Sequence, residues 1–266
     1  MDDELEAFGY AARQVYEPAI IGQGSRIGRG RVLWDQFEGA LGRCLANRNV
    51  DTRQLTERVN EMAIAKIIAE DPDVTGDIVY EPDDISPDGR KIDFVIFGDE
   101  QNKYVEVKTV HPKSEDTERD WANYLARKER HPPGVYYTVA KEAMGGAIYA
   151  NTFASRSNFL TYALEFESRL TGAKELRGGP GILIICGNGF AWSVDDLEDF
   201  ADYYHTGRHR LDDPFALMEQ HHIEAEGIQL LRNIDHIGYM RRGVNVPQHQ
   251  DYAAGVRGPR IMGPPA

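Results

Sequence analysis

The sequence predicts a mixed α/β fold of the α+β class, in which helices flank one central mixed sheet, and three observations support this. Residues 51–70 place apolar side chains at helical spacing. Three short β-type segments follow between residues 77 and 110, and turn residues separate them. The apolar run over residues 181–187 is typical of a strand covered on both faces. Together they predict one core that contains both kinds of element.

The composition permits a sizeable core and limits the function classes. The chain has 266 residues, of which 41% are hydrophobic, so global disorder is excluded. The formal net charge is −13, which argues against a general nucleic-acid coat but allows a nucleic-acid enzyme with a local basic path. No apolar run is long enough to span a bilayer, and we expect no secretory signal over residues 1–20. Two cysteines are too few for a disulfide scaffold and fit a reducing, cytoplasmic compartment.

Local signals place the elements of the core in order. Asp51-Thr52 is an N-cap for a helix that runs to about residue 70, and a shorter amphipathic helix over residues 35–46 precedes it. Turn sequences at Ser86–Gly89 and Gly98–Asn102 separate three strands, which are expected to pair as an antiparallel meander. These strands are predicted over residues 77–81, 91–97 and 103–110.

The second half of the chain predicts a further helix over residues 155–170, a buried strand over 181–187, and helices over 193–204 and from 212 to about 231. A helix over residues 117–130 and an extra strand over 135–140 are expected before them. The resulting division is an N-terminal extension (1–50), a core (51–190) with an insertion at about 111–154, a C-terminal helical part packed on the core (191–254), and a flexible tail (255–266).

Two neighbouring strands carry charged residues where apolar ones are expected. Glu106 and Lys108 alternate with valines, so they project from the same face of their strand. Asp93 is the one carboxylate in the preceding strand, and a short turn allows the two strands to pair. Buried charges are costly unless they are paired or bind a metal. Two convergent carboxylates suit Mg²⁺ or Mn²⁺, with Asp93 and Glu106 as metal ligands. The alternative is a surface-facing strand edge with an ordinary Glu–Lys pair.

The pattern Asp93…Glu106-x-Lys108 resembles the PD-(D/E)xK nuclease superfamily, which has the restriction-endonuclease-like fold. The resemblance covers about residues 51–190 and implies a core of helix, three-stranded meander, helix and a further parallel strand. It implies that Asp93, Glu106 and Lys108 are catalytic, with Lys108 positioning water. The Pro that often precedes the motif Asp is replaced by Ile92, and the literal Pro87-Asp88 lies in a turn.

Many members of this superfamily carry a supporting acid on the first core helix. The resemblance implies Glu61 for this role, with Glu57, one turn earlier on the same face, as the second candidate. The other interpretation of both is a solvated helix acid. Further residues are candidates for nucleic-acid contacts: Arg26, Arg29 and Arg31 in a Gly-rich segment that is either a mobile basic arm or an ordinary loop, His111 and Lys113 after the third strand, and Arg156 at the start of the second core helix.

We therefore expect a hydrolase of phosphodiester bonds, an endonuclease or exonuclease that uses Mg²⁺ or Mn²⁺. DNA is the favoured substrate, and RNA is the alternative. Defence against foreign DNA and DNA repair are both compatible with such a core. A homodimer is compatible with cutting both strands of a duplex. The alternative from another class is a catalytically silent module of the same fold, which would act as a nucleic-acid- or protein-binding scaffold.

Overall fold

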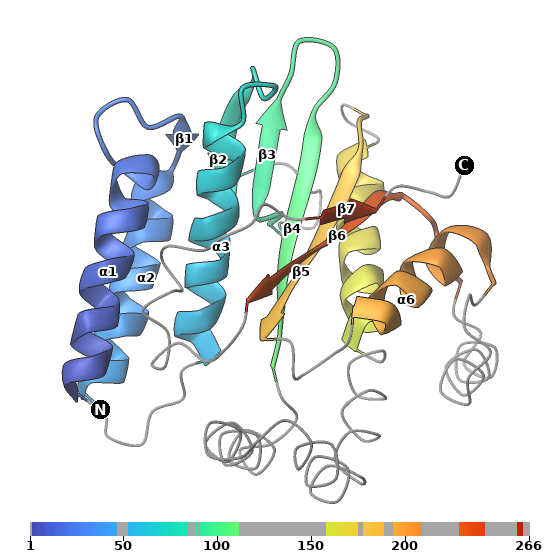
Figure 1. The fold of residues 1–266 in the computed structure, drawn as a ribbon. Helices are drawn as coiled ribbons and strands as arrows, with labels where there is room; N and C mark the ends of the chain where they lie inside the picture. The colour runs from blue at the N-terminus through green and yellow to red at the C-terminus, as the bar shows by residue number, and fades with distance from the viewer. Residues whose placement is uncertain are drawn as a thin grey trace, which may run out of the picture.

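A seven-stranded mixed sheet lies between two layers of helices in the computed structural model of the chain (Figure 1). The structure describes residues 2–46, 53–83, 89, 91–111, 158–174, 178–188, 194–208, 229–242 and 260–262. The strands follow one another in the sheet in the order β1 to β7. This arrangement confirms the predicted α+β class with one central mixed sheet.

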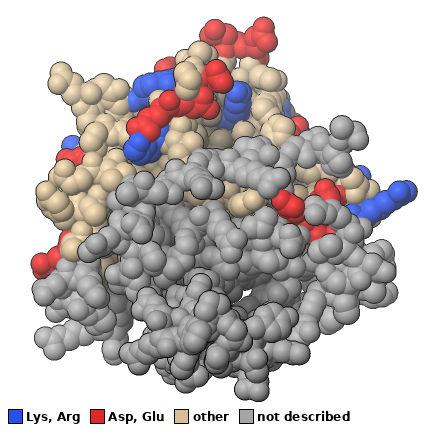
Figure 2. All heavy atoms as spheres, viewed as in Figure 1, with Lys and Arg blue, Asp and Glu red and all other residues tan. Residues whose placement is uncertain are grey.

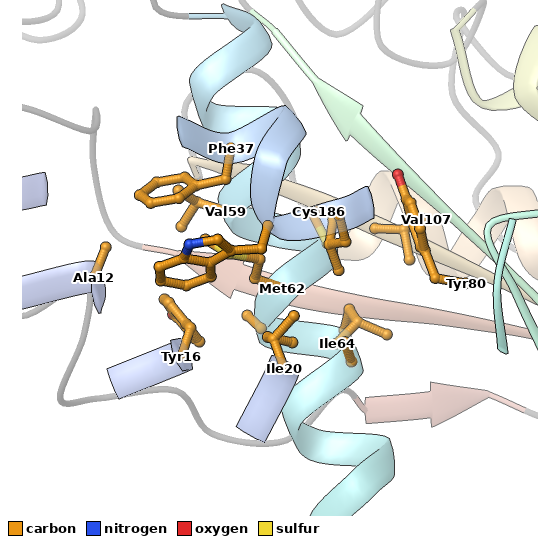
Figure 3. Close-up of a cluster of buried hydrophobic side chains, with 14 of the residues drawn as sticks. Ala12, Tyr16, Ile20, Phe37, Val59, Met62, Ile64, Tyr80, Val107 and Cys186 are labelled. Carbon is orange, nitrogen blue, oxygen red and sulfur yellow. The ribbon is translucent and has the colours of Figure 1, made fainter. Parts of the chain in front are cut away.

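One face of the sheet is covered by α1 (Asp2–Ile20), α2 (Gly30–Ala46) and α3 (Arg53–Glu70). Figure 3 shows Tyr16, Phe37 and Met62 of these helices in one buried cluster with Val107 of the sheet. α3 ends at residue 70 as predicted. α2 begins at Gly30 rather than at residue 35, because Leu33 is buried on the same stripe as Phe37 and extends the apolar face by a turn.

The Gly-rich segment joins α1 to α2 and forms part of the fold. Its short strand β1 (Ile27–Gly28) pairs in parallel with the next strand of the sheet. A Cβ at Gly30 would lie 2.1 Å from the carbonyl oxygen of Ile20, so only glycine allows α2 to begin this close to the end of α1. The guanidinium of Arg26 donates hydrogen bonds to the carbonyl oxygens of Ala69 and Val74. Of the two interpretations of the segment, the mobile basic arm does not hold for this part, which pairs and hydrogen-bonds with the rest of the fold.

The predicted meander is confirmed as β2 (Asp77–Tyr80), β3 (Phe94–Phe97) and β4 (Lys103–Val110), which pair antiparallel in that order. β3 begins three residues later than predicted. It pairs with β4 only at Lys103, Tyr104 and Val105, whereas β4 pairs with β5 from Tyr104 to Val110. The second half of β4 therefore has no β3 partner in the ladder, and Asp93 stands at the point where the two strands part.

The other face of the sheet is covered by the helix over residues 158–174 and by α6 (Val194–Thr206). β5 (Gly181–Asn188) runs parallel to β4 and is buried as predicted. The prediction of a purely helical C-terminal part is wrong, because this part contains the strand β6 (Ile234–Arg242), which runs parallel to β5. β7 (Arg260–Met262) pairs antiparallel with β6, so the predicted flexible tail contains a strand.

Several predicted features lie outside the described residues: the helix over 117–130, the strand over 135–140, most of the helix from 212 to about 231, and the Pro87-Asp88 turn. Residues 229–231, at the end of that last helix, are not helical. Among the described helices, none has the length and apolar character needed to cross a membrane. Cys44 and Cys186 are both buried thiols that form no disulfide, as predicted for Cys186.

A buried hydrogen bond ties α3 to β4. The side-chain amide of Asn60 donates to Oγ1 of Thr109 at 2.9 Å, and both residues are buried. We expect Thr109→Val to lower the free energy of unfolding by about 1–3 kcal/mol, because it leaves a buried amide without its acceptor at almost unchanged volume. Denaturant unfolding measures this. Thr109→Ser keeps the hydroxyl and is the matched control; equal losses in the two variants would contradict the role of the hydrogen bond.

Candidate active site

Asp93 and Glu106 lie side by side where β3 separates from β4. Phe94 is opposite Val105 in the ladder, so the same register continued by one residue brings Asp93 opposite Glu106. The Asp93 carboxylate accepts a hydrogen bond from the backbone N–H of Val107, with 2.7 Å between Oδ2 and the nitrogen. This bond satisfies an N–H of β4 that β3 no longer reaches and holds the side chain against the strand.

The Glu106 carboxylate is fully buried, with 0% of its side chain exposed. Its Oε1 lies 2.9 Å from Nζ of Lys108 and 2.7 Å from Nη1 of Arg169. These contacts are ion pairs rather than well-aligned hydrogen bonds. Its Oε2 has no hydrogen-bond partner among the described residues. A buried carboxylate oxygen without a partner is costly, and such an oxygen suits a cation that is brought in from outside.

Lys108 stands between Glu106 and the outside of the molecule. Its Nζ lies 3.6 Å from Oε2 of Glu165, whose side chain is half exposed, and 5.9 Å from the centre of the Tyr162 ring. Burial is the largest single influence on the pKa of Lys108 and lowers it, but the contact with Glu106 and the charges of Glu106 and Asp93 together outweigh burial, so the pKa is raised. The residue is therefore a charged ammonium group at neutral pH, with one carboxylate beneath it and a second one on the solvent side.

Glu61 of α3 belongs to a second polar network on the opposite face of the sheet. Its Oε2 lies 2.7 Å from Nη1 of Arg58 and accepts a hydrogen bond of 2.8 Å from the Tyr80 hydroxyl at the end of β2. Gln36 of α2 accepts from both Arg58 and Tyr80 at 2.8 Å. The network joins α2, α3 and β2 beside the point where Asp93 enters β3.

Burial and neighbouring acids raise the pKa of two carboxyl groups, Asp93 and Glu61. Burial raises the pKa of Asp93 well above its usual range, and the charges of Glu106 and Glu61 raise it further. The Val107 N–H and the Lys108 charge oppose this rise. Burial also raises the pKa of Glu61 from 4.5 to about 7, against the lowering effect of Arg58. Groups whose proton affinity is perturbed in this way cluster at functional sites.

Of the two helix acids, Glu61 is the one beside the carboxylate site. Only 6% of its residue surface is exposed, and its charge acts on Asp93. The side chain of Glu57 is 38% exposed, and its Oε1 lies 3.1 Å from Nε2 of His111. His111 is thus placed at the end of β4 by an acid from α3, three residues beyond Lys108.

The remaining nucleic-acid candidates lie elsewhere. Arg29 pairs with Asp83, Arg31 is exposed, and Lys113 and Arg156 lie outside the described residues. On the described part of the face in Figure 2, acidic and basic side chains are interspersed instead of forming one basic patch. Of the candidates that the structure describes, neither Arg29 nor Arg31 is in an ion pair or hydrogen bond with Asp93, Glu106 or Lys108.

Sequence reasoning missed three residues of the site: Arg58, Tyr80 and Arg169. The apolar stripe of the second core helix predicts its buried face, and Arg169 lies beside Phe166 and Leu170 on it. A charged residue beside an apolar stripe is usually interpreted as exposed to solvent, but the Arg169 side chain contacts Glu106. The need of a buried Glu106 for a counter-charge is the signal that could have pointed to an arginine on this helix.

Comparison of the chain with family models, curated proteins and solved structures finds no match. Membership of the PD-(D/E)xK superfamily therefore stays a prediction from the residues themselves.

Because the pKa of Glu61 is raised, the free energy of unfolding in metal-free buffer should depend on pH. An acid whose folded pKa is raised holds its proton more tightly in the folded state, so its contribution is most favourable below pH 4.5 and is lost as the pH rises through about 7. We expect the stability advantage of the parent over Glu61→Gln to shrink by about 1–3 kcal/mol between pH 4.5 and pH 8.

Denaturant unfolding of both proteins at several pH values, with a chelator present, measures this difference. Exposed Glu70→Gln on the same helix is the control and should show no such trend. A difference between parent and Glu61→Gln that is constant with pH would contradict the buried, proton-binding Glu61.

Proposed function

We propose that the protein is a Mg²⁺- or Mn²⁺-dependent nuclease that hydrolyses phosphodiester bonds, of DNA in preference to RNA. One observation carries the proposal: the buried Glu106 carboxylate has an oxygen without a hydrogen-bond partner among the described residues, a second carboxylate from Asp93 beside it, and the ammonium group of Lys108 above it. This is the donor set of a hard divalent cation with a cationic group at its edge.

The residues present fit such a cation. Among the described residues, no group of three or more His, Cys, Asp and Glu side chains could hold a metal ion. Two carboxylates suffice for Mg²⁺, which keeps several waters and takes phosphate oxygens from its substrate. Asp93 and Glu106 would hold the ion, and the metal would supply Lewis-acid activation of the phosphate and of a bound water.

Each side chain of the site has a distinct task in this proposal. Glu106 offers Oε2, because Oε1 is the oxygen that Lys108 and Arg169 contact. Asp93 is held in place by the Val107 N–H, so the carboxylate is oriented before anything binds. Lys108 orients the attacking water and stabilises the negative charge that develops on the phosphate. Glu61, through its charge beside Asp93, keeps the site attractive to cations.

The arrangement of the core also supports the proposal. A helix (α3), a three-stranded meander (β2 to β4), a second helix (158–174) and a parallel strand (β5) follow one another in the order that the resemblance implied. The preference for DNA, an endonuclease or exonuclease mode and a role in defence or repair are part of the proposal and rest on the resemblance. A catalytically silent scaffold of the same fold is the competing outcome.

Cleavage assays test the proposal directly. The parent protein, incubated with plasmid, linear duplex, single-stranded DNA and RNA in Mg²⁺ or Mn²⁺, should cleave at least one DNA substrate. Lys108→Met and Asp93→Asn should each slow cleavage by about 10²–10⁴-fold, the usual contribution of a group acting directly on a reaction. Lys66→Met on α3, which removes an exposed lysine paired with Glu70, is the matched control and should cleave like the parent. Equal activity in all four proteins would overturn the proposal.

Metal binding should depend on pH, because the ion must displace protons from carboxylates that hold them tightly. With the pKa of Asp93 raised by burial and by its neighbours, the apparent affinity for Mn²⁺ should be higher at pH 8 than at pH 6. The rise in melting temperature on adding Mn²⁺ measures this, and Asp93→Asn should abolish it. A silent scaffold would show no Mn²⁺ stabilisation at either pH.

A further inference from the structure

Arg169 contacts Glu106 directly, but the proposed chemistry gives it no task. Its side chain is 11% exposed and belongs to the helix over residues 158–174. It lies 2.7 Å from Oε1 of Glu106 and donates a hydrogen bond of 2.8 Å to the carbonyl oxygen of Lys91, two residues before Asp93. Its Nε donates to the carbonyl oxygen of Glu165 in its own helix. Arg169 is thus fixed at three points by groups from three segments.

Lys108 is held differently. Both cations contact the same oxygen of Glu106, but Lys108 has a second carboxylate, Glu165, on the solvent side. Arg169 also approaches the Glu165 carboxylate, with 4.0 Å between Nη2 and Oε2, but its hydrogen bonds run to two backbone carbonyl oxygens, which a rigid guanidinium fits well. A fully buried carboxylate needs at least one counter-charge that stays in place. Of the two cations, Arg169 is the one whose backbone hydrogen bonds keep it in place beside Glu106.

We infer that Arg169 is the permanent counter-ion of Glu106 and a positioning residue, which leaves Lys108 free to turn from Glu106 toward a phosphate substrate. Arg169 also holds the Lys91 carbonyl group, two residues before Asp93. A single side chain therefore fixes the position of the Asp93 backbone relative to Glu106. Without it, Lys108 would be the sole neutralising partner of a buried charge and would be kept on Glu106. The role of Lys108 toward substrate in this inference rests on the proposed nuclease function.

The first test follows the freedom of Lys108 itself and needs neither metal nor cleavage. Reductive methylation by formaldehyde at fixed pH, read by peptide mass spectrometry, measures how readily the Lys108 amine leaves its partners. We expect Arg169→Met and Arg169→Gln to slow labelling of Lys108 several-fold, while labelling of exposed Lys103 is unchanged. The glutamine variant keeps a donor for the Lys91 carbonyl, so it covers the case in which Arg169→Met does not fold.

The second test compares cleavage. Arg169→Met should lower kcat by about tenfold or more, the scale of loss that misplacing a reacting group causes, with little change in KM. Arg169→Lys restores the charge and should recover part of the rate. Arg13→Met, which removes the 2.7 Å ion pair with Glu38 between α1 and α2, is the matched control for losing an Arg–Glu pair and should leave both readouts unchanged.

The outcomes separate this inference from the proposed function. Slower Lys108 labelling in the Arg169 variants supports the inference even if the parent cleaves no nucleic acid, in which case the proposed function alone has failed. Labelling that is unchanged or faster in folded Arg169→Met and Arg169→Gln overturns the inference, whatever the activity of the parent. Cleavage at the parent rate by both Arg169→Met and Arg169→Gln overturns the inference as well.

Discussion

A fully buried carboxylate in the middle of the central sheet is the constraint on which the rest of the site depends. Glu106 stands on β4 on the face covered by the helix over residues 158–174, among apolar side chains. An uncompensated charge in such a place costs several kcal/mol. The convergence of Lys108 and Arg169 on one of its oxygens follows from that cost. The other oxygen remains unpartnered within the described part of the chain, which a purely structural ion pair has no reason to leave.

The geometry of the sheet explains why the site lies where it does. β3 pairs with only the first half of β4, and at the point of separation the Asp93 carboxylate takes over an N–H that the ladder no longer satisfies. The open edge of β4 is then within reach of both helix layers. Glu61 approaches from the face covered by α1 to α3, and Glu106 is on the other face. Asp93 stands between them and feels both charges.

One part of this site was predictable, because side chains alternate between the two faces of a strand. Glu106 and Lys108 share a face in any β4 conformation, and a lone Asp93 among apolar residues stands out without a structure. Arg169 was not predictable, since which polar residue of a helix meets a strand depends on the packing of the helix on the sheet. β6 was missed for a related reason. Its Asp235 reads as a loop residue, yet its carboxylate accepts from the Gly181 N–H and from Lys174, so tertiary contacts compensate for weak strand propensity.

The balance of charges within the site explains why it suits a ligand better than it suits stability. Asp93, Glu106 and Glu61 face the cations Lys108, Arg169 and Arg58. Yet burial and the charges of Glu106 and Glu61 raise the pKa of Asp93 against the opposing effects of the Val107 N–H and Lys108, so the cations do not fully satisfy the carboxylates. Apolar residues of similar volume would remove this cost in a protein selected for stability alone. In the function that we propose, the chain keeps these costly carboxylates because a bound cation would relieve the cost of burying them.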